Sequence, residues 1–433
     1  MNEQFKTASH DLPVGPELEE FMRVGWLDSG SDAERDAVAE WTPLRRKRLH
    51  EAFPGERLLI PAGTFKQRSN DQFYRFRPHS AYTWLTGDQA PEGVLVIEPG
   101  GDSVLYMRPR LERHDNDRMY GEFWVGRRPT LRETSQRLGI ETRHIDELHP
   151  SGRSADDPLL AAVLSELRLV KDEWEVAQIE EAIAITTRGF EDVVRALPRA
   201  GSERALEGVF WSRARLEGND VGYHSIVAAG AHAAVLHWTE NDGPLRDGEL
   251  LLLDAGAETR TLYTADITRV LPISGRFTPL QRDLYELCRT ANDAALAVLK
   301  PGRAYRDFHR AAMAVLSDGL VGMGLLSQAD ADKELYRRWT LCGSGHMLGL
   351  DVHDCAQARA QFYLDGVLAE GHVLTVEPGI YFQPDDGLIP AELRGMGLRI
   401  EENVLITSDG YRMLSHALPR EASAVEAWMD SLA

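Results

Sequence analysis

Short apolar runs that end at glycine or proline recur between residues 57 and 107. They are RLLIPAG (57–63), TWLTG (83–87) and GVLVIEPGGDSVLYM (93–107), and each run predicts strands. The segment RETSQRLGIETRHIDEL (132–148) predicts a helix that leads into a further strand. Earlier, the basic run WTPLRRKRLHEAF (41–53) predicts a helix whose charged side chains face solvent. This alternation of strands and helices favours an α/β domain that ends near residue 158.

Helical periodicity takes over beyond that point, in a long stretch rich in Ala, Leu, Glu and Arg. We predict helices over 160–197, after Gly201, and over 280–299 and 308–326, with strands from His224 to Ile273 and from His372 to Ile406. The chain is therefore expected to form two domains, 1–158 and 159–433, a number that suits its length of 433 residues.

The second domain contains two similar segments. GELLLLD (248–254) and GHVLTVE (371–377) each consist of a glycine, an apolar strand and a carboxylate six positions after the glycine. Each is followed by another strand with an embedded acid, Asp266 in TADITRVLPI and Glu401 in GLRIEENVLIT. This layout is typical of a duplicated unit that builds one site between its copies, although strand sequences can also resemble each other by chance.

Composition narrows the choice of function. The hydrophobic and charged fractions, 43% and 27%, are those of an ordinary globular protein. No apolar stretch approaches the roughly 20 residues of a membrane span, and the first residues do not form a secretion signal. Three cysteines suit a reducing compartment, so we expect a cytoplasmic protein. A net charge of −20 argues against binding to nucleic acid or anionic membranes.

Four acids stand out because their surroundings are apolar. Asp254 closes a strand, where an aspartate is often only a turn or cap residue, but Asp266 lies within an apolar run and Glu377 ends another. By strand alternation, Glu401 faces the same side as Arg399. Four such acids cannot all be ionised at close quarters without cations, so they are either scattered or share metal ions.

His346 supplies a nitrogen ligand for the second of these alternatives. It lies in the glycine-rich segment GSGHMLGLDVHD (343–354), seven residues before His353. Four carboxylates and one neutral imidazole carry a charge of −4, which two divalent ions balance. Ligands that are mostly oxygen favour Mn²⁺ over zinc of the thiolate type. Two such ions can activate a bridging water, so the expected chemistry is hydrolysis.

With these residues identified, the sequence resembles the pita-bread metallopeptidases, and aminopeptidase P most closely among them. The matching segments follow the order of the family over most of residues 160–420. They are VLHWTEN (235–241), LLLDAGAE (251–258), YTADITR (263–269), SGHMLGLDVHD (344–354), VLTVEPGIY (373–381) and RGMGLRIEENVLIT (394–407). FRPHSAYTWLTG (76–87) and EFWVGRRP (122–129) also look like the N-terminal domain of aminopeptidase P, which simple methionine aminopeptidases lack. The resemblance implies an α/β fold in which an N-terminal α/β domain precedes a pseudo-symmetric pita-bread catalytic domain.

The resemblance also implies residue roles. Asp254 would bind the first metal ion, Asp266 and Glu401 would bridge both ions, and His346 and Glu377 would complete the second. Glu377 would act in addition as general base. His237 and His353 would contact the scissile amide or its oxyanion, Arg399 would steady the carboxylates, and Tyr381 would lie near the substrate. Cys342 departs from the family, which usually has a histidine at that position close to the substrate.

The activity implied is removal of the residue that precedes a proline, so the partners would be proline-containing peptides. A prolidase, which cuts only Xaa-Pro dipeptides, would share every metal ligand, and Arg394 is one candidate to capture a dipeptide carboxylate. An inactive binding module of the same fold is the other alternative, but in such proteins the ligand set is eroded. The family further suggests a homo-oligomer, a dimer or tetramer.

Overall fold

The computed structural model describes residues 15–27, 33–115, 117 and 119–432. The chain separates into two compact units, Met1–Leu167 and Arg168–Ala433. The division falls near the end of helix α6 (Pro158–Arg168), whereas the sequence pattern places the boundary at the start of that helix. Among the described helices, none combines the length and the apolar character that a membrane crossing requires.

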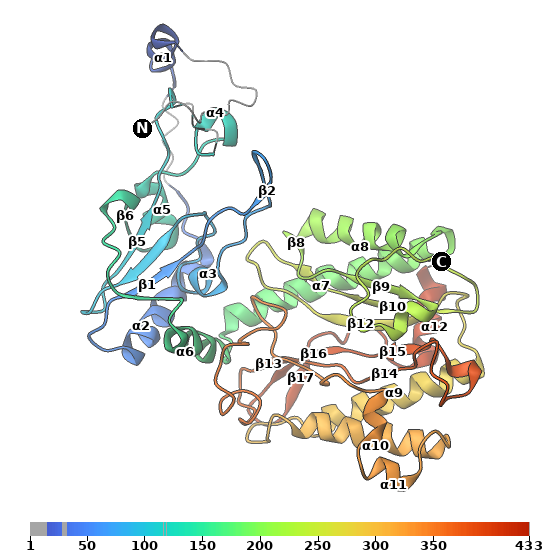
Figure 1. Ribbon diagram of the computed structural model, residues 1–433. Helices are drawn as coiled ribbons and strands as arrows, with labels where there is room; N and C mark the ends of the chain where they lie inside the picture. The colour runs from blue at the N-terminus through green and yellow to red at the C-terminus, as the bar shows by residue number, and fades with distance from the viewer. Residues whose placement is uncertain (1–14, 28–32, 116, 118, 433) are drawn as a thin grey trace. The chain divides into compact units, whose positions relative to one another are not determined.

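The first unit is built on a five-stranded mixed sheet in the order β6-β5-β4-β1-β7 (Figure 1). Its strands are β1 (Leu58–Pro61), β4 (Val94–Ile97), β5 (Ser103–Met107), β6 (Glu141–His144) and β7 (Arg153–Ser154), with a separate hairpin of β2 (Gln67–Ser69) and β3 (Gln72–Phe73). Its helices are α1 (Pro16–Met22), α2 (Thr42–Ala52), α3 (Ser80–Thr86), α4 (Glu122–Val125), α5 (Leu131–Leu138) and most of α6. The predicted strands at 57–63 and 93–107 and the helix and strand within 132–148 are therefore confirmed.

The prediction of a strand at TWLTG is wrong, because these residues belong to α3. All seven residues of α3 are buried, and the helix ends at Gly87, whose φ of +77° forms a left-handed cap. A short apolar run does not distinguish a buried helix from a buried strand.

The basic run at 41–53 forms the expected helix, α2, but two of its arginines do not face solvent. Arg45 and Arg46 are 2% and 7% exposed. Their guanidinium groups donate to the carbonyls of Trp84 and Leu85, both at 2.9 Å. Carbonyls in the last turn of a helix lack partners within the helix, so α2 supplies the donors that α3 needs. Burial lowers the pKa of Arg46 to about 10.

In the second unit, helices cover strands that come from two halves of the chain (Figure 1). The helices are α7 (Glu173–Ala196), α8 (Glu203–Glu217), α9 (Pro279–Ala297), α10 (Asp307–Gly322), α11 (Gln328–Ala331) and α12 (Ala422–Leu432). The strands are β8 (Asp220–Val221), β9 (Ile226–Ala229), β10 (Leu250–Ala255), β11 (Ala257–Glu258), β12 (Ile267–Pro272), β13 (Val373–Val376), β14 (Gly379–Tyr381), β15 (Gly397–Arg399), β16 (Glu402–Ile406) and β17 (Tyr411–Met413). In Figure 1, α7 and α8 lie on one side of these strands, and α9 and α10 lie on the other.

The long helical stretch predicted over 160–197 is interrupted between α6 and α7. Asp172 caps α7, because its carboxylate accepts from the backbone of Glu175 at 2.9 Å while Glu175 accepts from the backbone of Asp172 at 3.1 Å. This reciprocal capping box starts a new helix at Glu173. The other predicted helices and strand regions of this unit are present.

The repeat in the sequence is accompanied by a repeat in local structure. β10 pairs antiparallel with β12, and β13 pairs antiparallel with β16. Gly248 and Gly371, which open the two similar segments, have φ values of +85° and +87°, a conformation that favours glycine. Each half thus leads a left-handed glycine into a buried strand that carries an acid at or just beyond its end.

Asp266 and Glu401 were predicted inside strands, but each lies one residue before its strand. The reason is that their backbone groups bond across the two halves. The amide of Asp266 donates to Oδ1 of Asn403 at 3.2 Å, and the amide of Glu401 donates to the carbonyl of Thr268 at 3.2 Å. These cross-links bring the acids of the two halves together.

Three buried charged side chains stabilise the turn that follows His353. Asp354 is 1% exposed and accepts from Lys171 Nζ at 2.7 Å and from Arg168. Burial acts to raise the pKa of Asp354, but the two cations outweigh it and hold that pKa well below its usual value. The pairing therefore stabilises the fold at neutral pH, and this stabilisation is lost as the pH falls through the lowered value.

We predict that Asp354→Asn destabilises the second unit by about 3–5 kcal/mol, because it leaves Lys171 and Arg168 buried without the full counter-charge. Urea unfolding followed by tryptophan fluorescence measures the change. Asp351→Asn is the matched control, because Asp351 also pairs with Arg168, at 2.8 Å, but its side chain is 40% exposed. Equal losses in the two variants would contradict this account of the buried group.

Candidate metal centre

All five predicted metal ligands line one cavity of about 440 Å³ in the second unit. They are Asp254, Asp266, His346, Glu377 and Glu401. The same cavity is lined by His237, His353, Arg399 and Cys342, which the sequence analysis assigned to the substrate side or to support of the acids. Residues separated by as many as 164 positions, from 237 to 401, therefore meet at one place.

The strand register explains why the four acids converge. Ala255 pairs with Ile267, so Asp254 near the end of β10 and Asp266 just before β12 lie at the same end of this strand pair. Val376 pairs with Glu402, so Glu377 just after β13 and Glu401 just before β16 share the corresponding end of the other pair. Each half of the repeat thus offers two carboxylates at one edge.

Short contacts tie the acids to each other and to His346. Nε2 of His346 lies 3.2 Å from Oδ2 of Asp266 and 3.5 Å from Oε1 of Glu377. Ligand atoms of Asp266, His346 and Glu401 all lie within 4.8 Å of one another, a spacing that suits a metal ion. Nδ1 of His346 lies 3.1 Å from the carbonyl of Met347. A proton on Nδ1 would be bonded there, which leaves Nε2 as the free ligand atom on the side of the carboxylates.

Arg399 is the cation closest to the carboxylates. It is 3% exposed, and its guanidinium donates to Asp254, to the hydroxyl of Tyr381 at 2.7 Å and to the hydroxyl of Thr268 at 3.0 Å. It also lies 4.0 Å from Glu377. One guanidinium offsets only part of the charge of four carboxylates, of which three are buried and Glu377 is partly buried.

The remaining imbalance appears in the pKa values. Burial, and after it the charges of the neighbouring carboxylates, raise the pKa of Glu401 well above its usual value. Burial raises the pKa of Glu377 to about 7, in spite of the opposing charges of His346 and Arg399. Burial acts to lower the pKa of His346, but Asp266 and Glu377 outweigh it and raise that pKa to about 9. Without metal, the cluster therefore retains protons that a metal ion would displace.

The donor set fits divalent cations. Oε1 of Glu401 is buried and has no hydrogen-bond partner in the part of the chain that the structure describes, although its other oxygen accepts from Thr268 at 2.7 Å. A buried carboxylate oxygen without a donor is costly, and a cation would satisfy it. Oxygen ligands with one imidazole nitrogen suit metal ions of hard to borderline character.

The residues assigned to the substrate side divide into two groups. His237 and His353 line the cavity, and the ring of His353 meets that of His346 edge to face at 4.4 Å between centroids. Cys342 also lines it. Tyr381, by contrast, is not among the described residues that line the cavity, and its hydroxyl accepts from Arg399 at 2.7 Å.

Two further residues of the centre were missed in the sequence. The hydroxyl of Tyr223 lies 2.6 Å from Oδ1 of Asp254 and 2.5 Å from Oδ1 of Asp266, and so links these two acids. Thr268 bonds both Glu401 and Arg399. Strand alternation from Asp266 could have found Thr268, which is two positions further on and faces the same side. Tyr223 has no comparable signal.

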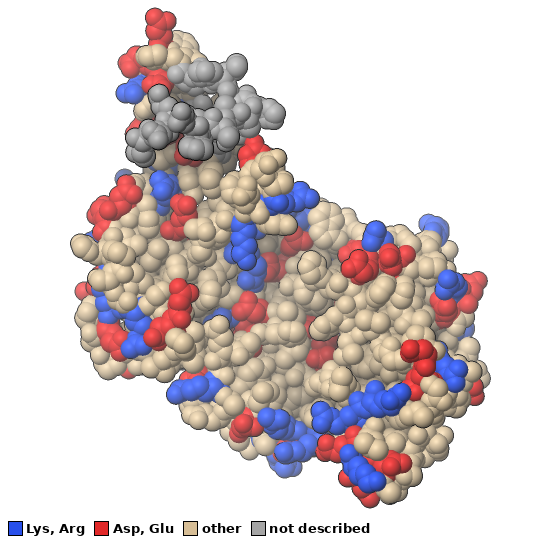
Figure 2. All heavy atoms as spheres, in the orientation of Figure 1, with Lys and Arg blue, Asp and Glu red and all other residues tan. Residues whose placement is uncertain are grey.

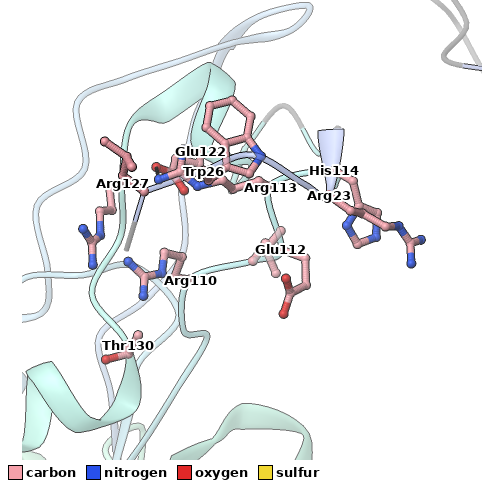
Figure 3. A pocket seen from close by; sticks show the side chains of 11 residues that line it. Arg23, Trp26, Arg110, Glu112, Arg113, His114, Glu122, Arg127 and Thr130 are labelled. Carbon is pink, nitrogen blue, oxygen red and sulfur yellow. Dashed lines mark ion pairs between the residues drawn. The ribbon is translucent and has the colours of Figure 1, made fainter. Parts of the chain in front are cut away.

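A second hollow, of about 640 Å³, lies in the first unit (Figure 3). Arginines dominate it, and Arg113 lies over the ring of Trp26 at 4.4 Å while it pairs with Glu122 at 3.1 Å. Among the described residues, neither of the two groups of side chains with metal-binding spacing lies there. Both of these groups lie in the second unit.

Comparison with known proteins agrees with this division. The model of the family described as "Metallopeptidase family M24" matches residues 177–408, and the model described as "Aminopeptidase P, N-terminal domain" matches residues 43–154. The chain is 49% identical to Xaa-Pro aminopeptidase 1 of Streptomyces coelicolor, over 97% of this chain and 93% of the relative. The structure of Pseudomonas aeruginosa aminopeptidase PepP has a TM-score of 0.83 and 30% identity, over 92% of this chain and 99% of the other.

Aminopeptidase P of Escherichia coli, solved with the inhibitor Pro-Leu, has a TM-score of 0.81 and 28% identity over the same shares of the two chains. The predicted resemblance and the predicted fold class, an α/β domain followed by a pita-bread domain, are confirmed. The chain belongs to metallopeptidase family M24 and carries the N-terminal domain of aminopeptidase P.

Proposed function

We propose that this metallopeptidase hydrolyses the bond between an N-terminal residue and a following proline. The observation that carries the proposal is the meeting of five potential metal ligands in one cavity with two further histidines. The printed names of the relatives, Xaa-Pro aminopeptidase and aminopeptidase P, support the choice of substrate.

In this proposal, the five side chains would hold two divalent ions, and Asp266 and Glu401 would be shared between them. Manganese is the metal we favour, because four of the five ligands bind through oxygen. When bound, such a pair of ions supplies an activated water and an electrophile for the scissile carbonyl. Arg399 and Tyr223 orient the carboxylates through the hydrogen bonds they make with them.

The remaining roles follow from position. Glu377 lines the cavity among the metal ligands, where its carboxylate would take the proton of the attacking water as general base. His237 and His353 line the cavity with ring nitrogens that can bond the scissile amide or the developing oxyanion. Tyr381 acts through Arg399 in this arrangement, and a direct contact with substrate stays a prediction.

Proline suits such a centre for a physical reason. The bond to a proline nitrogen is a tertiary amide without an N–H group, so a peptidase that grips its substrate by backbone hydrogen bonds loses one contact there. A centre that polarises the carbonyl does not need that contact. Ile226, Leu236 and Val352 give the cavity apolar wall for the ring.

The structure bears on the choice between an aminopeptidase and a prolidase. A dipeptidase is expected to capture the carboxylate of its short substrate with a cationic side chain. Arg399 is the single arginine or lysine among the described residues that line the cavity, and its guanidinium is already bonded. Arg394 is exposed, and its side chain donates to the carbonyl of Ile389 at 3.2 Å. This arrangement favours longer peptides.

An inactive binding module is less well supported, because all five ligand positions hold competent side chains. We further expect a cytoplasmic protein that forms a homo-oligomer, a dimer or tetramer, which sedimentation of the purified protein would show. Binding to nucleic acid is not part of the proposal, since the net charge is −20 and basic and acidic side chains are interspersed on the face shown in Figure 2.

The substrate preference can be tested directly. The manganese-loaded protein should release alanine from Ala-Pro-Ala and should cleave Ala-Pro poorly, since no free cation in the described cavity wall captures the dipeptide carboxylate. Chromatography of the products measures both rates, with Ala-Ala-Ala as the control for proline preference. Cleavage of the dipeptide alone would identify a prolidase, and no cleavage of any of the three peptides would favour a binding module.

The role of the bridging acids can be tested by substitution. Asp266→Asn should lower kcat on Ala-Pro-Ala by about a thousandfold or more, because the loss of a bridging charge removes several kcal/mol of stabilisation from the transition state. Asp247→Asn, at an exposed position of the same unit, is the control and should behave like the wild type. Turnover near the wild-type value in a metal-loaded Asp266→Asn protein would count against the bridging role.

The release of protons on metal binding gives a further test. His346 holds a proton at pH 7.5 in the metal-free chain, since its pKa is about 9, and burial raises the pKa of Glu401 well above its usual value. Manganese binding should therefore release protons, weaken as the pH falls from 8 to 6, and raise the melting temperature. Calorimetric titration in buffers of different ionisation enthalpy measures the release. Binding that releases no protons would contradict the assignment of these ligands.

A further inference from the structure

His237 lies on the connection between β9 and β10, and a single carboxylate fixes the position of this connection. The connection leaves β9 after Ala229, and its residues Leu236, His237 and Thr239 line the cavity of the metal centre. A loop that carries a substrate-binding side chain must keep its position, since a small displacement of a reacting or binding group lowers the rate strongly.

Glu203, at the first position of α8, makes contacts along this whole connection. It is fully buried. Its Oε1 accepts from the amide of Ala229 at 2.7 Å and lies 2.8 Å from Nδ1 of His232, while its Oε2 accepts from Nε1 of Trp238 at 2.9 Å and from the amide of Gly243 at 2.7 Å. The four partners lie at the start, in the middle and at the end of the connection.

The packing around Glu203 leaves little freedom. The rings of His232 and Trp238 stack at 3.8 Å between centroids, and the amide of Glu203 donates to the carbonyl of Gly243 at 3.0 Å. A Cβ atom at Gly243 would approach the His232 ring to 2.7 Å and Oε1 of Glu203 to 2.8 Å. The connection is thus fitted closely around the carboxylate.

Glu203, His232 and Asp242 have a spacing at which side chains can hold a metal ion. Hydrogen bonding argues against that use, because both oxygens of Glu203 already have two partners each. An ionised carboxylate offers about four lone-pair positions, and all four are occupied here. Asp242 is exposed. The group is better explained as an anchor.

We infer that Glu203 is a positioning residue for the peptidase reaction, which fixes His237 in the substrate cavity by holding Trp238 and Gly243 on its C-terminal side and Ala229 and His232 on its N-terminal side. The inference rests on the proposed role of His237. Trp238 follows His237 directly, so the site where its indole is held determines the backbone orientation at His237. Glu203 itself is not among the described residues that line the cavity.

The test is a double-mutant cycle on Ala-Pro-Ala with the metal-loaded enzyme. Glu203→Gln keeps the shape but presents an NH₂ group to donors, so kcat/KM should fall by about tenfold to a hundredfold while the metal content stays that of the wild type. In a His237→Ala background, the same substitution should cost less than about threefold, because the group that it positions is already gone. Glu207→Gln, one turn further along α8, is the control and should be neutral.

Trp238→Phe serves if Glu203→Gln does not fold, since it removes one donor and keeps a stacked ring, and it should shift kcat/KM in the same direction by less. Equal losses for Glu203→Gln in the two backgrounds, or no loss in either, would overturn the inference. Loss of a metal ion from Glu203→Gln would do so too, in favour of a third metal site.

A crystal structure of Glu203→Gln reads the position of His237 whether or not the chain cleaves Xaa-Pro peptides. A displaced His237 ring supports the inference, and an unchanged ring overturns it. Absence of wild-type activity on any Xaa-Pro peptide would instead defeat the proposed function alone.

Discussion

The second unit depends on four carboxylates that meet in one cavity, three of them buried, with too little positive charge around them. Arg399 is the closest cation, and Oε1 of Glu401 has no hydrogen-bond donor among the described residues. Buried acids in this state either retain protons or bind cations, and the raised pKa values of Glu401 and Glu377 express the first of these states. Metal ions would convert this costly arrangement into the reactive one, so the same repulsion that opposes folding of the metal-free chain would provide the affinity for metal.

The fold tolerates this arrangement because its two halves are tied together just behind the acids. The guanidinium of Arg269 is buried, donates to the carbonyl of Glu401 at 2.7 Å and pairs with Glu402 at 2.6 Å. Thr268 receives the amide of Glu401 through its carbonyl and bonds the Glu401 carboxylate through its hydroxyl. A strand of the first half thus holds a ligand of the second. Glu203 would serve the substrate side in a similar way.

Much of this centre could be predicted from the sequence, because alternation and repetition are local properties. The common side of Glu401 and Arg399 follows from the period of a strand, and the repeated glycine, strand and acid indicate two matching halves. The wrong or missing predictions concern residues whose secondary structure, burial or contacts depend on the tertiary structure. TWLTG belongs to a helix that is buried on all sides, which its apolar run does not distinguish from a buried strand, and Arg45 is buried because it meets carbonyls of that helix. Tyr223 reaches Asp254 and Asp266 from another segment, and no local pattern announces such a contact.

The most direct test of this account is a crystal structure of the manganese-loaded protein with anomalous scattering measured at the manganese edge. Two anomalous peaks roughly 3.5–4 Å apart are expected among the five ligand side chains, with Asp266 and Glu401 touching both. Peaks located elsewhere, such as beside Glu203 and His232, or an empty cavity at saturating manganese, would contradict the claim that these acids share a pair of metal ions.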